Sequence, residues 1–294
     1  MLAGTRRRLL LVALALVGCG LDVVGVAVSD DAGAPDAGLP EASPPPSDGA
    51  TDATVTDAGV DASDAGPVPA LYASSRSHLW KLDPTSNSFS TIGPWTGCGA
   101  GVEEVAVDSA GELLVTGIAN DVLYRVSATT AQCSLVAEDD MPYALSFAPA
   151  GVSDGGAETL VGYAGNGDYV RIGRATGDVV VVRATALGSY RPSGDLVAAK
   201  GKGYLSATSL VLGVCLGDCL LEVDLATGLV VKELGEFPST GIYGMAYWGG
   251  KVYGFANSGK VYVVTPDPFS VDATLDEPDS GVRWQGAGST TRAP

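Results

Sequence analysis

Carboxylate and aromatic side chains recur in this chain at the starts of short apolar runs. At these starts lie Glu103, Glu104, Tyr143, Asp195, Tyr243 and Trp284. Two carboxyl groups about 5–5.5 Å or 6.5–9.5 Å apart can hydrolyse a glycosidic bond, and aromatic faces suit a sugar ring. If the fold brings these positions together, they predict ligand contacts, with Glu103 or Glu104 and Asp195 as the acids of a hydrolase or lyase. The same carboxylates are equally typical of surface charges where strands begin.

Other catalytic or metal-binding chemistry has little support in the residue types. His78 is the only histidine, and no Gly-x-Ser-x-Gly turn or other nucleophile is spaced to pair with it. We therefore expect His78 to be a solvated loop residue and assign no catalytic residue. One histidine and no Cys-x-x-Cys pair argue against a zinc site, so no metal and no cofactor is predicted. The net charge of −17 argues against a nucleic acid partner.

A repeated strand pattern supplies the elements that would position those residues. An alternating apolar segment recurs five times, ending at Asp83, Ser127, Gly173, Asp224 and Thr265. Successive copies lie 41 to 51 residues apart, and a hairpin with a glycine-containing turn, such as 105–115 or 245–253, lies between them. Period-2 patterning with such turns is typical of strands. Two plus two strands in about 45 residues match one blade of a β-propeller.

The two ends of the repeat region together supply one more blade. The stretch from residue 70 to Asp83 and the stretch after Thr265 add up to one blade length. We therefore predict an all-β fold, a single propeller of five four-stranded blades over residues 70–294. The segment 282–285 would complete the blade that begins at Leu71, and this closure would remove the sheet edges. A six-bladed ring and an open β-sandwich are the alternatives.

The longest spacing indicates an extended loop in the fourth blade. The excess lies at 206–219, between the second and third strands of that blade, and contains the apolar run 209–214. In propellers this link lies on the same face as the loops between blades, so an exposed apolar run there is a candidate ligand contact. In the alternative, Leu210, Val211 and Leu212 pack beneath the loop as a small core.

The first 19 residues predict an export signal. Three arginines precede an apolar run, as in secretory signals, and the run ends in Leu-Val-Gly-Cys19. This ending resembles the lipobox of bacterial lipoproteins. The resemblance implies that residues 1–19 are a signal peptide, that Cys19 is lipidated, and that Gly20 in the next position permits sorting to the outer membrane. Cleavage after Ala27 and an uncleaved anchor are the alternatives.

Residues 20–69 predict a linker. They contain ten acidic residues and no Lys or Arg, and they repeat the tripeptide Asp-Ala-Gly. Such a segment cannot bury enough apolar surface to offset its chain entropy, and its like charges extend it. We therefore expect a disordered acidic spacer between the signal and the propeller.

The five cysteines bear on the compartment. With Cys19 lipidated, an even number remains for disulfides in an oxidising envelope. Cys215 and Cys219 can close a tight loop, and elimination leaves Cys98 with Cys133. Simple blade geometry argues against this second pair, because Cys98 would lie on a loop between blades at one face and Cys133 just past a turn at the other.

Signal, acidic spacer and strand repeat together resemble the propeller-repeat lipoproteins of bacteria, with a propeller of the WD40 or YVTN type. The resemblance is specific for the fold and weak for activity, because propellers host both enzymes and binding proteins. It implies an envelope protein anchored to the outer membrane, periplasmic or surface-exposed. Because the sequence contains no catalytic constellation beside the anchor, the spacer and the closed ring, we expect a propeller that binds a protein or a glycan. The alternatives are a glycoside hydrolase or lyase and a structural surface protein without a ligand.

Overall fold

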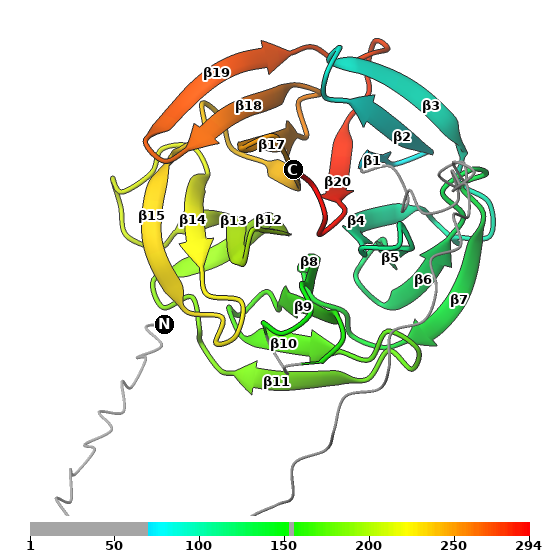
Figure 1. The fold of residues 1–294 in the computed structure, drawn as a ribbon, viewed down its shortest axis with the longest axis horizontal. Coiled ribbons are helices and arrows are strands. Elements are labelled where there is room, and N and C mark those ends of the chain that lie inside the picture. The colour runs from blue at the N-terminus through cyan, green and yellow to red at the C-terminus, as the bar shows by residue number, and fades with distance from the viewer. Residues whose placement is uncertain (1–69, 153–155) are drawn as a thin grey trace, which may run out of the picture. The chain divides into compact units, whose positions relative to one another are not determined.

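The described part of the chain, residues 70–152 and 156–294 of a computed structural model, forms a five-bladed β-propeller (Figure 1). The predicted signal, the lipidation site Cys19 and the linker lie outside the described residues. Each blade is a four-stranded antiparallel sheet. In this part of the chain no helix is long and apolar enough to cross a bilayer.

The strands follow one another from the axis outward in every blade. The first blade contains β20 (Trp284–Ser289), β1 (Leu71–Ser75), β2 (His78–Asp83) and β3 (Ser88–Pro94). The second contains β4 (Val102–Val107), β5 (Leu113–Gly117), β6 (Val122–Val126) and β7 (Cys133–Glu138). The third contains β8 (Ala144–Ala148), β9 (Thr159–Tyr163), β10 (Tyr169–Ile172) and β11 (Val179–Arg183). The fourth contains β12 (Tyr190–Ala199), β13 (Lys202–Ser209), β14 (Cys219–Val223) and β15 (Val230–Glu236). The fifth contains β16 (Ile242–Trp248), β17 (Lys251–Ala256), β18 (Val261–Pro266) and β19 (Phe269–Leu275).

The ring closes through the two ends of the propeller chain. β20 pairs antiparallel with β1, so that Leu71 lies opposite Ser289 and Ala73 opposite Ala287. The predictions of five blades and of closure by the C-terminal strand are therefore confirmed. The six-bladed ring and the open sandwich are wrong.

The inner strands need small residues because five of them crowd around one axis. A Cβ atom added to Gly286 on β20 would lie 2.1 Å from the carbonyl oxygen of Glu103 on β4. One added to Gly194 on β12 would lie 2.1 Å from the carbonyl oxygen of Ile242 on β16. Both distances are far below van der Waals contact, so glycine is required at these two crossings.

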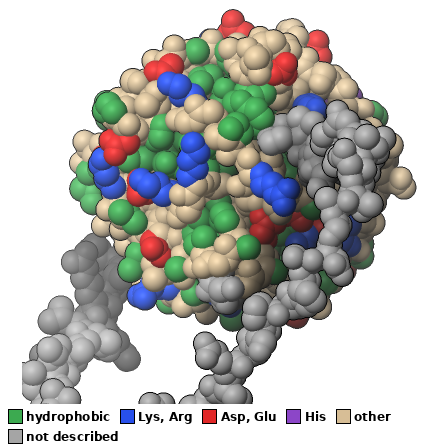
Figure 2. Space-filling model, in the orientation of Figure 1, with side chains coloured by type: hydrophobic (Ala, Val, Ile, Leu, Met, Phe, Trp, Pro, Cys, Tyr) green, Lys and Arg blue, Asp and Glu red, His purple; other side chains and the backbone are tan. Residues whose placement is uncertain are grey.

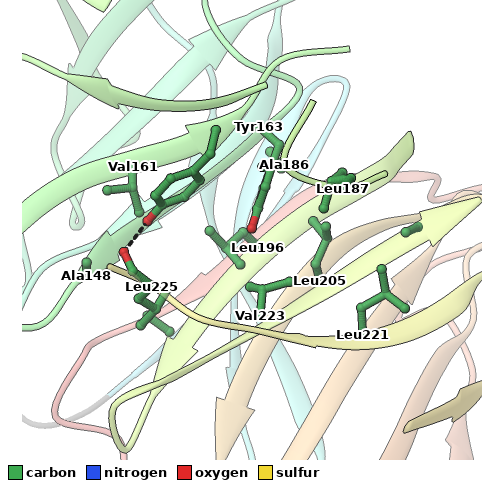
Figure 3. Packing of buried hydrophobic residues seen from close by; sticks show 14 of the residues in the cluster. Ala148, Val161, Tyr163, Ala186, Leu187, Leu196, Leu205, Leu221, Val223 and Leu225 are labelled. Carbon is green, nitrogen blue, oxygen red and sulfur yellow. Dashed lines mark hydrogen bonds between the residues drawn. The ribbon is translucent and has the colours of Figure 1, made fainter. Parts of the chain in front are cut away.

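The hydrophobic core lies between neighbouring blades. Figure 3 shows the cluster between the third and fourth blades, where Val161 and Tyr163 face Leu196, Leu205 and Val223. The hydroxyl groups of two buried tyrosines donate to backbone carbonyls of the next blade, Tyr163 to Gly228 at 2.7 Å and Tyr169 to Leu225 at 2.6 Å. These bonds satisfy the polar ends of the rings, so the aromatic bodies can be buried without an unpaired hydroxyl.

The Cys98–Cys133 disulfide forms, and the argument from simple blade geometry against it is wrong because the blades twist. The outer strands β3, β7, β11, β15 and β19 run around the circumference, whereas the inner strands surround the axis (Figure 1). Successive strands of a sheet rotate by about 20–25°, so the loop after β3 passes beside the turn before β7. There the N–H of Cys133 donates to the carbonyl of Thr96 at 2.8 Å. Cys98 and Cys133 form a disulfide with their Cα atoms 5.2 Å apart.

The surface of the propeller mixes charges of both signs. The visible part of the face in Figure 2 carries basic, acidic and hydrophobic side chains side by side. Several basic groups are paired, for example Lys202 with Glu222 at 3.0 Å and Lys232 with Asp267 at 3.1 Å. Exposed pairs of this kind contribute little stability.

Candidate functional site

A cavity of about 440 Å³ opens at the end of the axis where the inner strands begin. Its lining consists of Glu103, Glu104, Tyr143, Pro192, Ser193, Gly194, Tyr243 and Gln285. These residues come from all five blades, since β20, β4, β12, β16 and the segment before β8 each contribute. The volume lies in the range of small-molecule sites, about 300–1,000 Å³. The axis is therefore the candidate functional site.

Two tyrosine rings give the cavity an apolar, accessible wall. Tyr143 is 56% exposed and Tyr243 is 38% exposed, in contrast to the buried tyrosines between the blades. The ring of Tyr143 packs against the backbone at Gly165, where an added Cβ would lie 3.0 Å from it. Exposed aromatic rings with a polar tip are typical of contact surfaces.

Asp195 lies beside the cavity and is fully buried. Its Oδ1 accepts the N–H of Leu145 at 3.0 Å and of Leu196 at 2.9 Å, and its Oδ2 accepts the N–H of Ala287 at 3.3 Å. These donors belong to the inner strands β8, β12 and β20. One carboxylate therefore joins three blades at the axis.

Glu104 completes this buried group from the second blade. Burial raises the pKa of the Glu104 carboxyl well above its usual range, and the neighbouring Asp195 and Glu103 raise it further. Burial also raises the pKa of Asp195, but hydrogen bonds from three N–H groups and from Glu104 act in the opposite direction. Because Asp195 accepts these hydrogen bonds and Glu104 donates one of them, Glu104 is the member of the pair that keeps its proton to the higher pH.

Glu103 lies half-buried at the same edge of the cavity. Burial raises the pKa of its carboxyl, whereas the N–H of Ala119 lowers it. The negative charge of Asp121 raises the pKa of Glu103 and the positive charge of Arg76 lowers it. No Lys or Arg is among the lining residues of the cavity. The site is therefore acidic.

Four of the six residues predicted to contact a ligand line the axial cavity, and the other two, Asp195 and Trp284, do not. Glu103, Glu104, Tyr143 and Tyr243 line the cavity, and Asp195 lies behind it. Trp284 is displaced into the core, where its indole N–H donates to the carbonyl of Gly259 at 2.6 Å. The reason is strand alternation: the side chain of Trp284 faces the neighbouring sheet, and Gln285, one residue later, lines the cavity.

The inner strand of the fourth blade begins earlier than the sequence pattern predicts. β12 begins at Tyr190 rather than near Asp195, and its register shifts between Pro192 and Leu196. Pro192, Ser193 and Gly194 therefore line the cavity, while Asp195 lies one step deeper. A proline inside a strand is a signal of such an irregularity.

The acid pair does not have the geometry of a glycosidase. Glu104 and Asp195 are hydrogen-bonded to each other, whereas the two acids of a glycosidase stand on either side of the scissile bond, at least about 5 Å apart. Both oxygens of Asp195 already accept hydrogen bonds from backbone N–H groups. This arrangement supports a structural role for Asp195 and a cavity-facing role for Glu104.

His78 belongs to a different surface. It lines a second cavity of about 430 Å³ with Arg76, Asp279 and Arg283, and its Nδ1 lies 2.8 Å from the hydroxyl of Ser77. The residues around it are mostly exposed and come from the first blade and the segment before β20. Among the described residues, no acid lies in hydrogen-bond contact with the His78 ring.

The loop between β13 and β14 lies on the same face as the axial cavity. Leu212 at its tip is completely exposed, so the alternative in which Leu210, Val211 and Leu212 form a small core is wrong. The base of the loop is fixed by the disulfide between Cys215 and Cys219, whose Cα atoms are 5.8 Å apart. An apolar tip on a fixed base is a second candidate contact near the cavity.

Comparisons with known proteins give no family. No family model and no curated protein matches the sequence. A solved structure titled "Crystal structure of Nidogen/Laminin Complex" is similar, with a TM-score of 0.48 and 11% sequence identity, over 77% of this chain and 99% of that chain. At this similarity the match carries no argument about function. The function must be inferred from the axial site.

Proposed function

We propose that this chain is an envelope-anchored binding module whose axial cavity receives a ligand. In this proposal residues 1–19 are the signal peptide, Cys19 carries the lipid, residues 20–69 are the spacer, and residues 70–294 form the binding propeller. The observation that carries it is the cavity itself, to which all five blades contribute and in which two tyrosines are exposed beside carboxyl groups. The ligand is a protein or a glycan.

The position of the chain entry supports an anchored module. Ala70, the first described residue, lies beside Val107 and Thr290, which are at the far ends of β4 and β20 from the cavity. The described chain therefore begins at the end of the ring opposite the cavity. The two disulfides fit an oxidising compartment.

Ligand capture with a matched control tests the binding proposal. The full chain is compared with Tyr143→Ala/Tyr243→Ala in capture from envelope extract and on a glycan array. The control variant is Leu135→Ala/Val180→Ala, which removes side chains that are 58% and 60% exposed from the outer strands β7 and β11. We expect the same ligand with the wild type and the control and none with the tyrosine variant. Equal capture by all three proteins would refute the axial site.

Fractionation tests the anchor separately. Cys19→Ala is expected to move the protein from the membrane fraction to the soluble fraction of the envelope, because the lipid attachment point is lost. The intact mass of the wild type is expected to show cleavage before Cys19 and added acyl chains. A protein cleaved after Ala27, or Cys19→Ala protein that stays in the membrane fraction, would refute lipidation.

A further inference from the structure

We infer that a second cavity, the one that His78 lines, binds a small organic acid whose carboxylate or phosphate group is held by Arg76 and Arg283. We call it the His78 cavity. The turn between β1 and β2 and the segment that precedes β20 form it, and its volume of about 430 Å³ lies in the range of small-molecule sites. None of its lining residues lines the axial cavity, so the two sites can be tested independently.

A buried serine fixes the turn that carries the first arginine. The hydroxyl oxygen of Ser75, which is 5% exposed, accepts the backbone N–H of His78 at 3.1 Å and the indole N–H of Trp80 at 3.1 Å. The same hydroxyl donates to the carbonyl of His78 at 3.2 Å. Arg76 therefore stands on a turn that is already ordered, and a ligand that binds it loses little entropy to ordering the backbone.

A second tight turn carries the other arginine. The N–H of Val282 donates to the carbonyl of Asp279 at 3.2 Å. Between these residues Gly281 has a φ of +89°, in the left-handed region that glycine favours. Nη1 of Arg283 lies 3.5 Å from Oδ1 of Asn257. The two guanidinium groups thus reach the cavity from two separate, fixed turns.

The two arginines lack acidic partners. The chain has 34 acidic residues against 17 Lys and Arg, yet within its described part neither Arg76 nor Arg283 forms an ion pair. Arg76 acts on the carboxyl of Glu103 only at longer range. Asp279 lines the cavity but is exposed and pairs with neither arginine. Two positive charges therefore face one negative charge in a cavity of a strongly acidic protein.

The donors in this cavity suit an oxyanion. A guanidinium group offers a planar fork of N–H donors that matches a carboxylate or a phosphate. The hydroxyl of Ser77 lies 2.8 Å from Nδ1 of His78, and when it donates there, Nε2 carries the ring proton and can donate to the ligand. The volume leaves room for an organic body beside the anionic group, against the half-buried side chain of Val282.

Titration calorimetry of the full chain at pH 7 and constant ionic strength tests the site. Glucose 6-phosphate and glucuronate carry the two anionic groups on a similar body, glucose is the neutral counterpart, and inorganic phosphate is the anion without a body. We expect both sugar acids to bind at least about 10-fold more tightly than glucose, because charge-assisted hydrogen bonds are strong. They should also bind more tightly than inorganic phosphate. The tighter of the two sugar acids shows whether the site prefers a phosphate or a carboxylate.

Two double variants with the same change in net charge assign the site. Arg76→Gln/Arg283→Gln removes both guanidinium groups and should weaken binding of the sugar acids at least about 10-fold. The control Arg183→Gln/Arg292→Gln removes two exposed arginines at the end of β11 and near the C-terminus, and it should bind as the wild type does.

Two further variants separate the sites and the charges. Asp279→Asn removes the acid of the His78 cavity and should bind the sugar acids more tightly than the wild type. Tyr143→Ala/Tyr243→Ala changes the axial cavity alone and should leave this binding unchanged.

Four results would overturn the inference. The first is equal binding of the sugar acids and glucose, or no binding of any probe at millimolar concentration. The second is binding of inorganic phosphate alone, which would exclude an organic acid. The third is an equal loss in the two arginine variants, which would reduce the effect to overall charge. The fourth is a loss in Tyr143→Ala/Tyr243→Ala without a loss in Arg76→Gln/Arg283→Gln, which would place the anion in the axial cavity.

Discussion

Replacing Asp195 with alanine tests whether one buried carboxylate holds the ring together at its axis. The substitution removes the acceptor for the N–H groups of Leu145, Leu196 and Ala287 and the partner of Glu104. Water has little access to this position, because Asp195 is fully buried. The variant therefore leaves donors from three blades unpaired in a dry environment.

The expected loss of stability follows from these bonds. An unpaired buried donor costs about 1–3 kcal/mol, so three of them cost roughly 3–9 kcal/mol, and removal of the desolvated carboxyl group recovers part of this. We expect a loss of at least about 3 kcal/mol, a large fraction of the about 5–15 kcal/mol typical of a folded domain. Asp195→Asn keeps the oxygen that serves Leu145 and Leu196, so its loss should be about 1–3 kcal/mol.

Urea unfolding at pH 7, followed by circular dichroism and tryptophan fluorescence, measures these losses. Fluorescence reports on the ring because Trp284 lies in the core between the first and fifth blades. The control Asp279→Ala removes an exposed carboxyl and should unfold within about 0.5 kcal/mol of the wild type. A loss below about 1 kcal/mol for Asp195→Ala, with an unchanged denaturant slope, would refute the role of Asp195.

Three further predictions concern other parts of the ring. Because the pKa of Glu104 is raised in the folded state, the unfolded chain loses this proton first as the pH rises. The free energy of unfolding of the wild type should therefore fall relative to that of Glu104→Gln above about pH 4.3. Parallel curves of unfolding free energy against pH would contradict this. Loss of the Cys98–Cys133 disulfide, which spans 35 residues, should cost about 4 kcal/mol of unfolding free energy. Loss of Cys215–Cys219, which spans 4 residues, should cost about 2 kcal/mol. Unfolding of the paired serine variants measures both, and the reverse order would show that the loop length does not decide the loss. Gly228→Ala places a Cβ 2.2 Å from the Tyr169 ring and should destabilise more than Gly201→Ala, which has a similar positive φ and open space around it, so equal melting temperatures would show that the contact with Tyr169 does not matter.

Much of the fold follows from the sequence because blades are local units. The segments ending at Asp83, Ser127, Gly173, Asp224 and Thr265 lie on the third strands of the five blades. Each such strand pairs with neighbours close in sequence, so period-2 patterning and turns suffice to find it. The exception is the pairing of β20 with β1. It could be predicted because the lengths of the two end segments add up to one blade.

The site was less predictable because it depends on single positions. A shift of one residue along a strand moves a side chain to the other face, and this decided that Gln285 lines the cavity and Trp284 does not. The pairing of Cys98 with Cys133 depended on the twist of the blades, which sequence patterns do not contain. The hydrogen bond between Glu104 and Asp195 joins residues of two blades, and nothing in either segment indicates it.

The position of β20 has a consequence for the order in which the protein matures. The blades built from neighbouring segments can form while a chain is still being made, but β20 is the last strand in sequence and the one nearest the axis in its blade. Joining it to β1 pairs strands from the two ends of the described chain. Gln285 on β20 is part of the cavity wall. The wall of the cavity is therefore completed only when β20 has joined β1.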